Sequence, residues 1–436
     1  MAAAADNKAS ATATIFALSS GAPPAGVAVV RISGPHAGSA IDLLTGRPRP
    51  APRRAVLRTL RDPQNGTPLD RALLLWLPGP GSATGEDMAE LHLHGGRAVT
   101  AAVLNALARQ FGLRPAEAGE FTRRAFEHRR IDLNEAEALG DLLAAETEAQ
   151  RRNAMLLASG TLSRAIDDWQ DRILALSARL EAELDFSDED DVAPLGPGFA
   201  DEVAGLGAEV MHWQGRVPVE RLRDGIRVVL AGPPNSGKST LLNALAGREA
   251  AIVTAVAGTT RDLIEAPIAI GGLPFLLVDT AGLHTGSGDI VEAIGMDRAV
   301  QAMAAADILL WLGEPEGAPL GAIRIGAQAD RMPHDGDRFD LLLSARSGQG
   351  MDALTELLMR RAAQLLPAEG EAALSARQRD ALARLGEALA LAGGEHDLLL
   401  IAEALRLARR AIDALTGRSG TEEMLDGLFG RFCIGK

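Results

Sequence analysis

The chain has 436 residues, 47% of them hydrophobic, which is enough to bury more than one core. Its formal net charge of -14 excludes indiscriminate binding to nucleic acid, because phosphate contacts need clustered cations. A single cysteine excludes an intramolecular disulfide, and no apolar run approaches the ~20 residues that span a bilayer. No basic and apolar leader opens the sequence, so we expect a cytoplasmic protein of several domains.

Lysine is rare in this chain. Three of the 44 basic residues are lysines, namely Lys8, Lys238 and Lys436, and the others are arginines. A lysine that remains against such a bias marks a position where a compact ammonium on a flexible stem is needed. Because Lys8 falls in a predicted disordered arm, the sequence singles out Lys238 and Lys436.

Two stretches of helical periodicity lie on either side of the middle of the chain. Apolar residues recur at Ile166, Trp169, Ile173, Leu176, Leu180 and Leu184, and again at Leu382, Leu385, Leu389, Ile401, Leu405 and Ile412. Amphipathic halves need each other to bury their apolar faces, so we expect one helical domain built from both. The stretch "VAPLGPGFAD", from Val192, is predicted to be an internal loop of the first half.

Between these halves stands "IRVVLAGPPNSGKSTLLNALAG", which predicts a strand, a glycine-rich loop and a helix. Backbone N–H groups of such a loop turn toward phosphate oxygens, Lys238 reaches the terminal phosphates and Ser239 holds Mg²⁺. A chance glycine-rich turn would lack the strand and helix on either side. The predicted nucleotide contacts here are Asn235, Ser236, Gly237, Lys238, Ser239 and Thr240.

Two later stretches fit the same nucleotide site. "GLPFLLVDTAGLHT" predicts a strand ending at Asp279, whose carboxylate holds the Mg²⁺ shell. "VAGTTRD" alone is typical of an ordinary loop, but its place between the other motifs favours a switch in which Thr260 ligates Mg²⁺. The predicted contacts are Thr254, Ala255, Val256, Ala257, Gly258, Thr259, Thr260, Asp279, Thr280, Ala281 and Gly282.

The base-recognition motifs are weaker. "SAR", which is Ser344, Ala345 and Arg346, follows the apolar stretch "FDLLL". The expected Asn-Lys-x-Asp instead reads Ala327-Gln328-Ala329-Asp330. Asp330 can still accept the N1–H and the amine of guanine, so adenine is disfavoured. Loss of the asparagine amide costs about 1 kcal/mol or more, and we expect a GTPase with a loosened grip on its nucleotide.

Five further stretches, together with these motifs, resemble the MnmE (TrmE) family of tRNA modification GTPases over nearly the full length. They are "VAVVRISGP", "TGEDMAELHLHGG", "GEFTRRAFEHRRIDLNEAEALGDLLAAET", "EAELDFSDEDD" and the final "FCIGK". The resemblance implies a multidomain α/β plus all-α fold. Its parts are an N-terminal α/β tetrahydrofolate-binding and dimerisation domain (1–118), a discontinuous helical domain (119–220 and 370–436) and an inserted Ras-like P-loop GTPase domain (221–369).

The resemblance also implies the function. A homodimer and its FAD-dependent partner MnmG (GidA) would install an aminomethyl or carboxymethylaminomethyl group at C5 of the wobble uridine of certain tRNAs. The implied ligands are GTP, Mg²⁺, K⁺ and 5-formyl-tetrahydrofolate or a related folate. A second class stays open, a GTPase switch of ribosome assembly whose other domains are interaction modules.

For hydrolysis, the resemblance implies that a K⁺ takes the electrostatic place of an arginine finger when two GTPase domains meet. Its ligands would be Asn235, Thr254, the Val256 carbonyl and Thr259. Glu292, in "DIVEAIG", would act on the attacking water through a bridging water, and a surface helix charge is the alternative. The implied catalytic residues are Glu292, Lys238 and Asn235.

For folate, the resemblance implies contacts from Arg31, Glu86, Arg130 and Lys436, since a carboxylate suits the pterin edge and cations suit the glutamate tail. Structural roles stay open for the first three: a strand-end charge, a helix N-terminal carboxylate and a member of a solvated cluster. That cluster, with Arg123, Arg124 and Arg129, is also a candidate path for tRNA phosphates. Cys433 would fold toward this site as an accessory thiol, or be buried as a small apolar residue.

Overall fold

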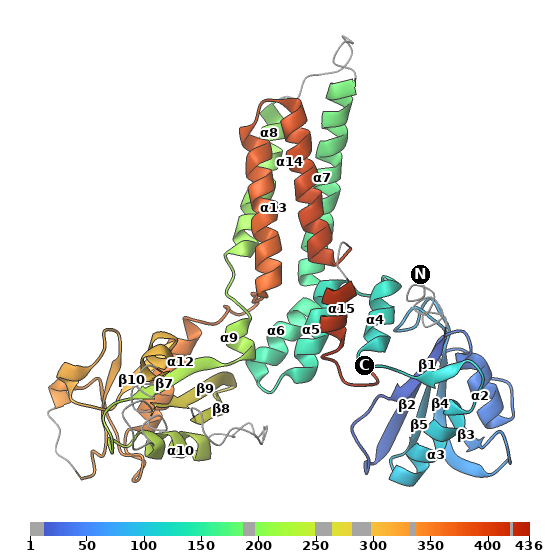
Figure 1. The fold of residues 1–436 in the computed structure, drawn as a ribbon, viewed down its shortest axis with the longest axis horizontal. Helices are drawn as coiled ribbons and strands as arrows, with labels where there is room; N and C mark the ends of the chain where they lie inside the picture. Colours follow the sequence, from blue (N-terminus) through green and yellow to red (C-terminus); the bar gives the residue numbers. More distant parts are fainter. Residues whose placement is uncertain (1–12, 186–196, 249–263, 281–297, 332–335, 419–421) are drawn as a thin grey trace. The chain divides into compact units, whose positions relative to one another are not determined.

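The structure is a computed structural model that describes residues 13–185, 197–248, 264–280, 298–331, 336–418 and 422–436 (Figure 1). It divides into an N-terminal unit, Met1–Gly140 with Thr416–Lys436, and a second unit, Asp141–Leu415. This division assigns residues 119–140 and 416–436 to the N-terminal unit, whereas the domain boundaries expected from the sequence assign them to the helical domain. Those boundaries stay a prediction.

The N-terminal unit is built on a six-stranded sheet with strand order β3-β4-β5-β2-β1-β6, in which only β1 and β6 are parallel. Helices α2 and α3 pack against it, and the side chains between them form an apolar core that includes Val30, Leu74 and Leu91. The elements are β1 (Thr14–Leu18), β2 (Val27–Ser33), α2 (Ala37–Thr45), β3 (Val56–Arg61), β4 (Pro68–Leu77), β5 (Met88–His94), α3 (Arg97–Ala108) and β6 (Leu113–Pro115).

Helices from both ends of the chain complete the N-terminal unit. They are α4 (Glu120–Glu127), α15 (Glu422–Phe429) and the part of α5 (Leu133–Ala144) up to Gly140. Leu133, Phe429 and Phe432 meet in a small apolar cluster, and a β-bridge pairs Ala118 with Ile434. The C-terminal tail is therefore part of the N-terminal unit.

The second unit contains another six-stranded sheet, with order β12-β11-β10-β7-β9-β8 and only β8 antiparallel to its neighbour. The apolar, β-branched strand β7 is buried near its centre, as the sequence predicts. Its elements are α9 (Glu220–Arg223), β7 (Ile226–Ala231), α10 (Lys238–Arg248), β8 (Ile264–Ile270), β9 (Leu273–Asp279), β10 (Ile308–Trp311), β11 (Ile323–Gly326), β12 (Leu341–Leu342) and α12 (Met351–Ala363), with short 3₁₀ turns η2 (Pro315–Gly317) and η3 (Gly336–Arg338).

The same unit contains the helices α6 (Glu148–Ala158), α7 (Thr161–Asp185), α8 (Pro197–Gln214), α13 (Ala376–Gly394) and α14 (Leu398–Thr416). The helical periodicity is confirmed, because the predicted apolar positions of α7, α13 and α14 are buried, except that Leu184 is half-buried. The loop prediction is wrong from Pro197 onward, where α8 begins. Proline suits a first helical turn, and Phe199, Val203 and Leu206 are buried at helical spacing beyond it.

No helix in the ranges given above is both long and apolar enough to cross a membrane.

Candidate functional site

The loop between β7 and α10 has the backbone that a phosphate cradle requires. Gly232 and Gly237 have φ of 146° and 101°, in the region that favours glycine. A Cβ on Gly232 would lie 2.8 Å from the Leu312 carbonyl oxygen, so no side chain fits there. The predicted order of strand, loop and helix is confirmed.

Lys238 lies at the first turn of α10 and is 3% exposed. Its Nζ donates hydrogen bonds to the carbonyl oxygens of Gly232 and Pro233, at 2.9 and 2.8 Å. Burial lowers the pKa of the ammonium, and the charge of Asp279 acts in the opposite direction. The ammonium is thus held inside the loop that would surround the phosphates.

Ser239 and Asp279 bring a hydroxyl and a carboxylate together where α10 begins and β9 ends. The Ser239 Oγ donates a hydrogen bond to Asp279 Oδ2, and Asp279 is fully buried. The next residue, Thr280, donates to the Leu230 carbonyl oxygen at 2.9 Å, which ties the end of β9 to β7. Hard oxygen donors of this kind fit Mg²⁺. The other predicted Mg²⁺ ligand, Thr260, lies outside the described residues.

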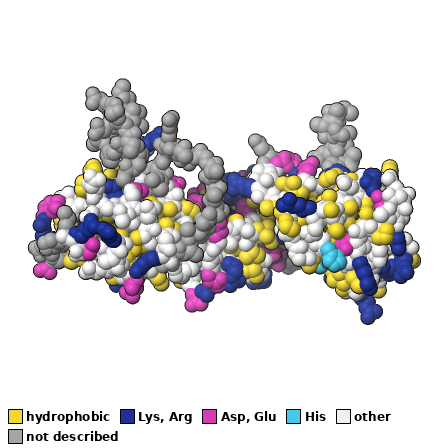
Figure 2. Space-filling view, turned by 90° about the horizontal axis from the view of Figure 1, so that it is seen from below, with side chains coloured by type: hydrophobic (Ala, Val, Ile, Leu, Met, Phe, Trp, Pro, Cys, Tyr) yellow, Lys and Arg dark blue, Asp and Glu magenta, His cyan; other side chains and the backbone are white. Residues whose placement is uncertain are grey.

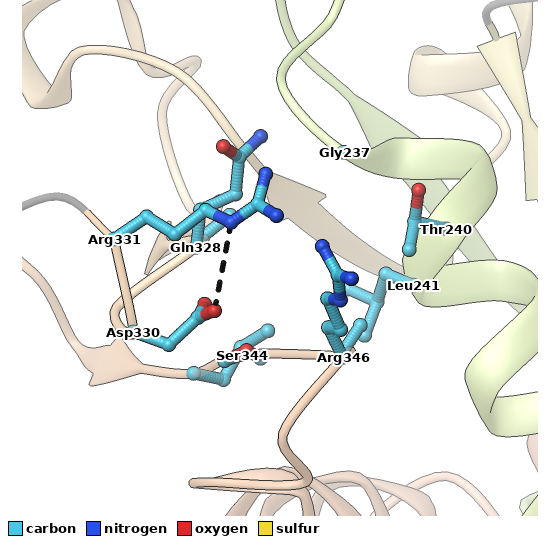
Figure 3. A pocket seen from close by; sticks show the side chains of 11 residues that line it. Gly237, Thr240, Leu241, Gln328, Asp330, Arg331, Ser344 and Arg346 are labelled. Atoms are coloured by element: carbon cyan, nitrogen blue, oxygen red, sulfur yellow. Dashed lines mark ion pairs between the residues drawn. The ribbon is translucent and has the colours of Figure 1, made fainter.

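A cavity of about 240 Å³ opens beside the P-loop (Figure 3). Asp330 and Ser344 lie at one side, and a hydrogen bond from Ser344 is the main cause that lowers the pKa of Asp330. Arg331 lies 3.8 Å from the Asp330 carboxylate, and Arg346 lies on the side of the cavity where Leu241 also lies. The cavity walls come from Gly237, Thr240, Leu241, Ala327, Gln328, Asp330, Arg331, Leu343, Ser344, Ala345 and Arg346.

Gln328 connects this cavity to the P-loop, a contact that sequence reasoning missed. Its backbone has φ of 58°, and its Nε2 donates to the Asn235 carbonyl oxygen at 3.4 Å. Asn235 also has a positive φ, of 62°. The available signal was the position of Gln328, which stands where the base-recognition motif has its lysine.

Several predicted site residues lie outside the described residues, so the structure reports nothing of their contacts. Of the predicted K⁺ ligands only Asn235 is described. The predicted site residues that lie outside the described residues are Thr254, Ala255, Val256, Ala257, Gly258, Thr259, Thr260, Ala281, Gly282 and Glu292.

In the N-terminal unit, Glu86 belongs to a buried ion network. Its carboxylate accepts from Ser33 Oγ at 2.7 Å and from Arg124 Nη1 at 3.0 and 3.1 Å. Arg124 also contacts Glu120 at 2.9 Å, and Glu120 pairs with Arg114 at 2.6 Å. Burial opposes the charge of Glu120, but its hydrogen bonds with Arg114, the Glu117 N–H and Arg124 outweigh it and lower its pKa. Both oxygens of Glu86 are therefore already engaged within the protein.

Arg31 pairs with a carboxylate that sequence reasoning missed. Its Nη2 lies 3.0 Å from Glu90 Oε1, and its guanidinium lies 5.8 Å from the centre of the Phe121 ring. Arg31 on β2 and Glu90 on β5 are opposite each other in the antiparallel ladder. The alternation in "MAELHLH" could have indicated that Glu90 and His92 share the less buried face of β5.

Arg130 and Lys436 belong to the N-terminal unit but come from segments that are far apart in the sequence. A Cβ on Gly85, where φ is 82°, would lie 3.3 Å from Arg130 Cγ, so Gly85 permits the two loops to pack closely. Gly435 packs more closely still, on the Leu18 carbonyl at the end of β1, which brings the neighbouring Lys436 to that strand. Cys433 is exposed, so its prediction as a buried apolar residue is wrong.

The arginine cluster formed by α4 and the residues just after it is not simply solvated. Arg124 is 4% exposed and belongs to the ion network, which corrects its expected place in a solvated cluster. Arg123 contacts Glu127, Glu422 and Asp426. The tRNA path stays a prediction, and Arg129 and Arg130 are its exposed members.

Comparison with known proteins gives two family matches. The GTP-binding protein TrmE N-terminus matches residues 14–130, and the MnmE helical domain matches residues 133–433. The chain is 79% identical to the tRNA modification GTPase MnmE of Rhizorhabdus wittichii over 98% of both chains. It is 56% identical to the proteins of that name from Novosphingobium aromaticivorans and Erythrobacter litoralis, over 98% and 97% of this chain and 100% of each relative. The chain therefore belongs to the MnmE (TrmE) family of tRNA modification GTPases.

Proposed function

We propose that the chain is a cytoplasmic GTPase of tRNA modification. It forms a homodimer and, with an FAD-dependent MnmG partner, installs the aminomethyl or carboxymethylaminomethyl group at C5 of the wobble uridine. The observation that carries the GTPase part is the meeting of Lys238, Ser239 and Asp279 at the carboxyl ends of β7 and β9. In open α/β sheets ligands bind at this edge.

The phosphates of GTP would lie against the loop that precedes α10. Lys238 would exchange its two carbonyl acceptors for phosphate oxygens, which keeps the buried ammonium hydrogen-bonded throughout. Ser239 and Thr260, with Asp279 beside them, would hold Mg²⁺, and Asn235, Thr254, Val256 and Thr259 would hold K⁺. Both ions would supply positive charge close to the negative charge that develops on the transferred phosphoryl group. Glu292 would orient the attacking water.

Guanine would occupy the cavity lined by Asp330 and Ser344. The ionised Asp330 would accept two hydrogen bonds from guanine, from its N1–H and its exocyclic amine. Adenine has a lone pair at N1, which would repel the carboxylate. Ser344 supports this role, because its hydrogen bond lowers the pKa of Asp330. The planar guanidinium of Arg346 lines the same cavity, where it would stack on the base.

The folate would bind at the N-terminal unit, near Arg31. Glu86 and Glu90 are both candidates to receive the pterin edge, since Arg124 and Ser33 engage the oxygens of Glu86 while Arg31 and His92 engage those of Glu90. The Arg31 and Glu90 side chains are 24% and 17% exposed, so a ligand can reach them. Arg130 and Lys436 would supply cations for the glutamate tail, with Cys433 as an accessory thiol.

Complementation of a strain that lacks the gene tests this function. The wild-type chain should restore the modified wobble uridine, measured by mass spectrometry of tRNA nucleosides, and K238A should not. K238A removes the ammonium at the phosphate cradle and leaves the sheet intact. Fully modified tRNA in the deletion strain would contradict the proposal and favour the ribosome-assembly switch.

A further inference from the structure

The segment of residues 47–61 is the most basic stretch of an acidic protein. It connects α2 to β3 and includes that strand, and it contains no acidic residue. We call it the arginine segment. Its six arginines are Arg47, Arg49, Arg53, Arg54, Arg58 and Arg61. Figure 2 shows dark-blue Lys and Arg side chains along the outer edge of the N-terminal unit, at the right of the view.

Only one arginine of this segment has a carboxylate partner among the described residues. Arg49 pairs with Asp42 at 2.9 Å. The side chains of Arg47 and Arg54 make no hydrogen bond or ion pair with any described residue, and both residues are exposed. The positive charge of the segment is therefore almost entirely unneutralised.

The other contacts of the segment orient its guanidinium groups without cancelling their charge. A carbonyl oxygen accepts a hydrogen bond but carries no full charge, so the arginine remains available to an anion. Three arginines make such bonds: Arg53 to the Gly81 oxygen, Arg58 to the Pro48 oxygen at 3.2 Å and Arg61 to the Gly66 oxygen at 3.1 Å.

Proline and an aromatic ring limit the freedom of the segment. In "RPRPAPRR", Pro48, Pro50 and Pro52 each fix their own φ and stiffen the chain. Pro50 is buried, and the Arg49 guanidinium lies 5.0 Å from the centre of the Trp76 ring. A partner would therefore meet charges that are partly preorganised, which reduces the entropy cost of binding.

The arginines on α4 behave differently. Arg123 and Arg124 are engaged by carboxylates of their own unit, so their charge is compensated. The arginines on α4 are thus paired with carboxylates, whereas most arginines of the arginine segment are not. An uncompensated group on the surface calls for a polyanionic partner, because phosphate contacts depend on local cations rather than on net charge.

We propose that the arginine segment binds the sugar–phosphate backbone of the tRNA substrate, by charge and without reading its sequence. This inference rests on the proposed function, which makes tRNA the polyanion that the protein meets. Guanidinium groups suit phosphate because their planar donors match its oxygens. The segment would orient the tRNA body, and the chemistry at the wobble base lies elsewhere.

The test compares tRNA binding by the wild-type full-length protein and by R47A/R54A across a KCl series. These two side chains make no hydrogen bond or ion pair with any described residue, so the variant should fold normally and hydrolyse GTP at the wild-type rate. The slope of log K for tRNA binding against log [KCl] is negative. Each phosphate that the variant no longer neutralises should reduce the magnitude of this slope by about 1, so the expected reduction is about 2. R47K/R54K keeps both charges and should retain most of the slope.

The matched control is R409A/R410A, which removes two exposed arginines from α14 in the second unit. It should bind tRNA with the wild-type affinity and slope. An unchanged slope in R47A/R54A, or an equal decrease in the control, would overturn the proposal while tRNA binding itself still supports the proposed function. Absence of tRNA binding by the wild type would overturn both. Binding to phosphatidylglycerol vesicles is measured for the same variants. If R47A/R54A loses vesicle binding but keeps tRNA binding, the segment binds a membrane surface instead of tRNA.

Discussion

The Ser239 hydroxyl donates a hydrogen bond to the buried Asp279 carboxylate, which joins the first turn of α10 to the last residue of β9. Two of the proposed Mg²⁺-site residues therefore already face each other. The contact depends on two stretches separated by 40 positions, so it exists only in the folded sheet.

S239A removes the hydroxyl from this contact and should lower GTP hydrolysis by about 100-fold or more, because one preorganised electrostatic partner is typically worth that much. Nucleotide binding in EDTA should change little. The measurement is steady-state hydrolysis over a Mg²⁺ series, with T355A on α12 as the control, since the Thr355 hydroxyl donates to the Met351 carbonyl oxygen of its own helix. A normal Mg²⁺ response in S239A would contradict the assignment.

R124A should destabilise the N-terminal unit by about 3–5 kcal/mol, because it leaves Glu86 and Glu120 as buried charges without their shared partner. R123A is the matched control. Its partners Glu422 and Asp426 are 70% and 64% exposed, so its cost should stay within about 1 kcal/mol. Urea unfolding, followed by circular dichroism, measures both, and equal midpoints would contradict the network's role.

The same network predicts a pH dependence. The folded pKa of Glu120 is lowered, so its stabilising contribution is present above the ordinary carboxyl range and is lost as pH falls through the folded value. E120Q should therefore be less stable than wild type at pH 7, and the difference should shrink on acidification. Parallel pH series of urea unfolding test this, and a constant difference would refute it.

Ser344 should control the acid limit of nucleotide binding. Its hydrogen bond lowers the pKa of Asp330, so S344A should move the loss of GDP affinity toward higher pH. Removal of the hydroxyl leaves a carboxylate that protonates more readily and then accepts fewer hydrogen bonds from guanine. Fluorescent GDP titrations over a pH series measure the shift, with S347A as a neighbouring control. Coincident acid limbs would exclude this role.

E90Q should weaken tetrahydrofolate binding by about 10-fold, since an amide replaces one acceptor for the pterin edge with a donor. E127Q on α4 serves as an exposed control. Isothermal titration with 5-formyl-tetrahydrofolate gives both affinities. If E90Q binds as tightly as wild type, Glu90 does not receive the pterin edge and the role returns to Glu86.

Local signals made much of the GTPase fold predictable. The β-branched strand, the glycine-rich loop and the leucine-rich helix are contiguous, so β7, the P-loop and α10 follow from one stretch. The buried apolar positions of α7, α13 and α14 likewise follow from period alone. The start of α8 at Pro197 was missed, because glycine and proline near a helix start resemble a loop in the sequence.

Tertiary register explains what the sequence did not predict. Glu90 lies 59 positions from Arg31, and only the pairing of β2 with β5 brings them together. Glu86 and Arg124 meet because α4 packs on the sheet, which no local pattern specifies. Gln328 contacts Asn235 through loops that are 93 positions apart. Each of these contacts depends on which elements become neighbours.

The most direct test of the proposed GTPase mechanism is steady-state GTP hydrolysis in KCl against NaCl at equal ionic strength, with ATP as the control. We predict a fast rate that requires both GTP and K⁺, because in the proposed mechanism Asp330 would select guanine and Asn235 would help to hold the ion. Equal slow rates in both salts would contradict the K⁺ assignment, and equal rates with ATP would contradict the role of Asp330.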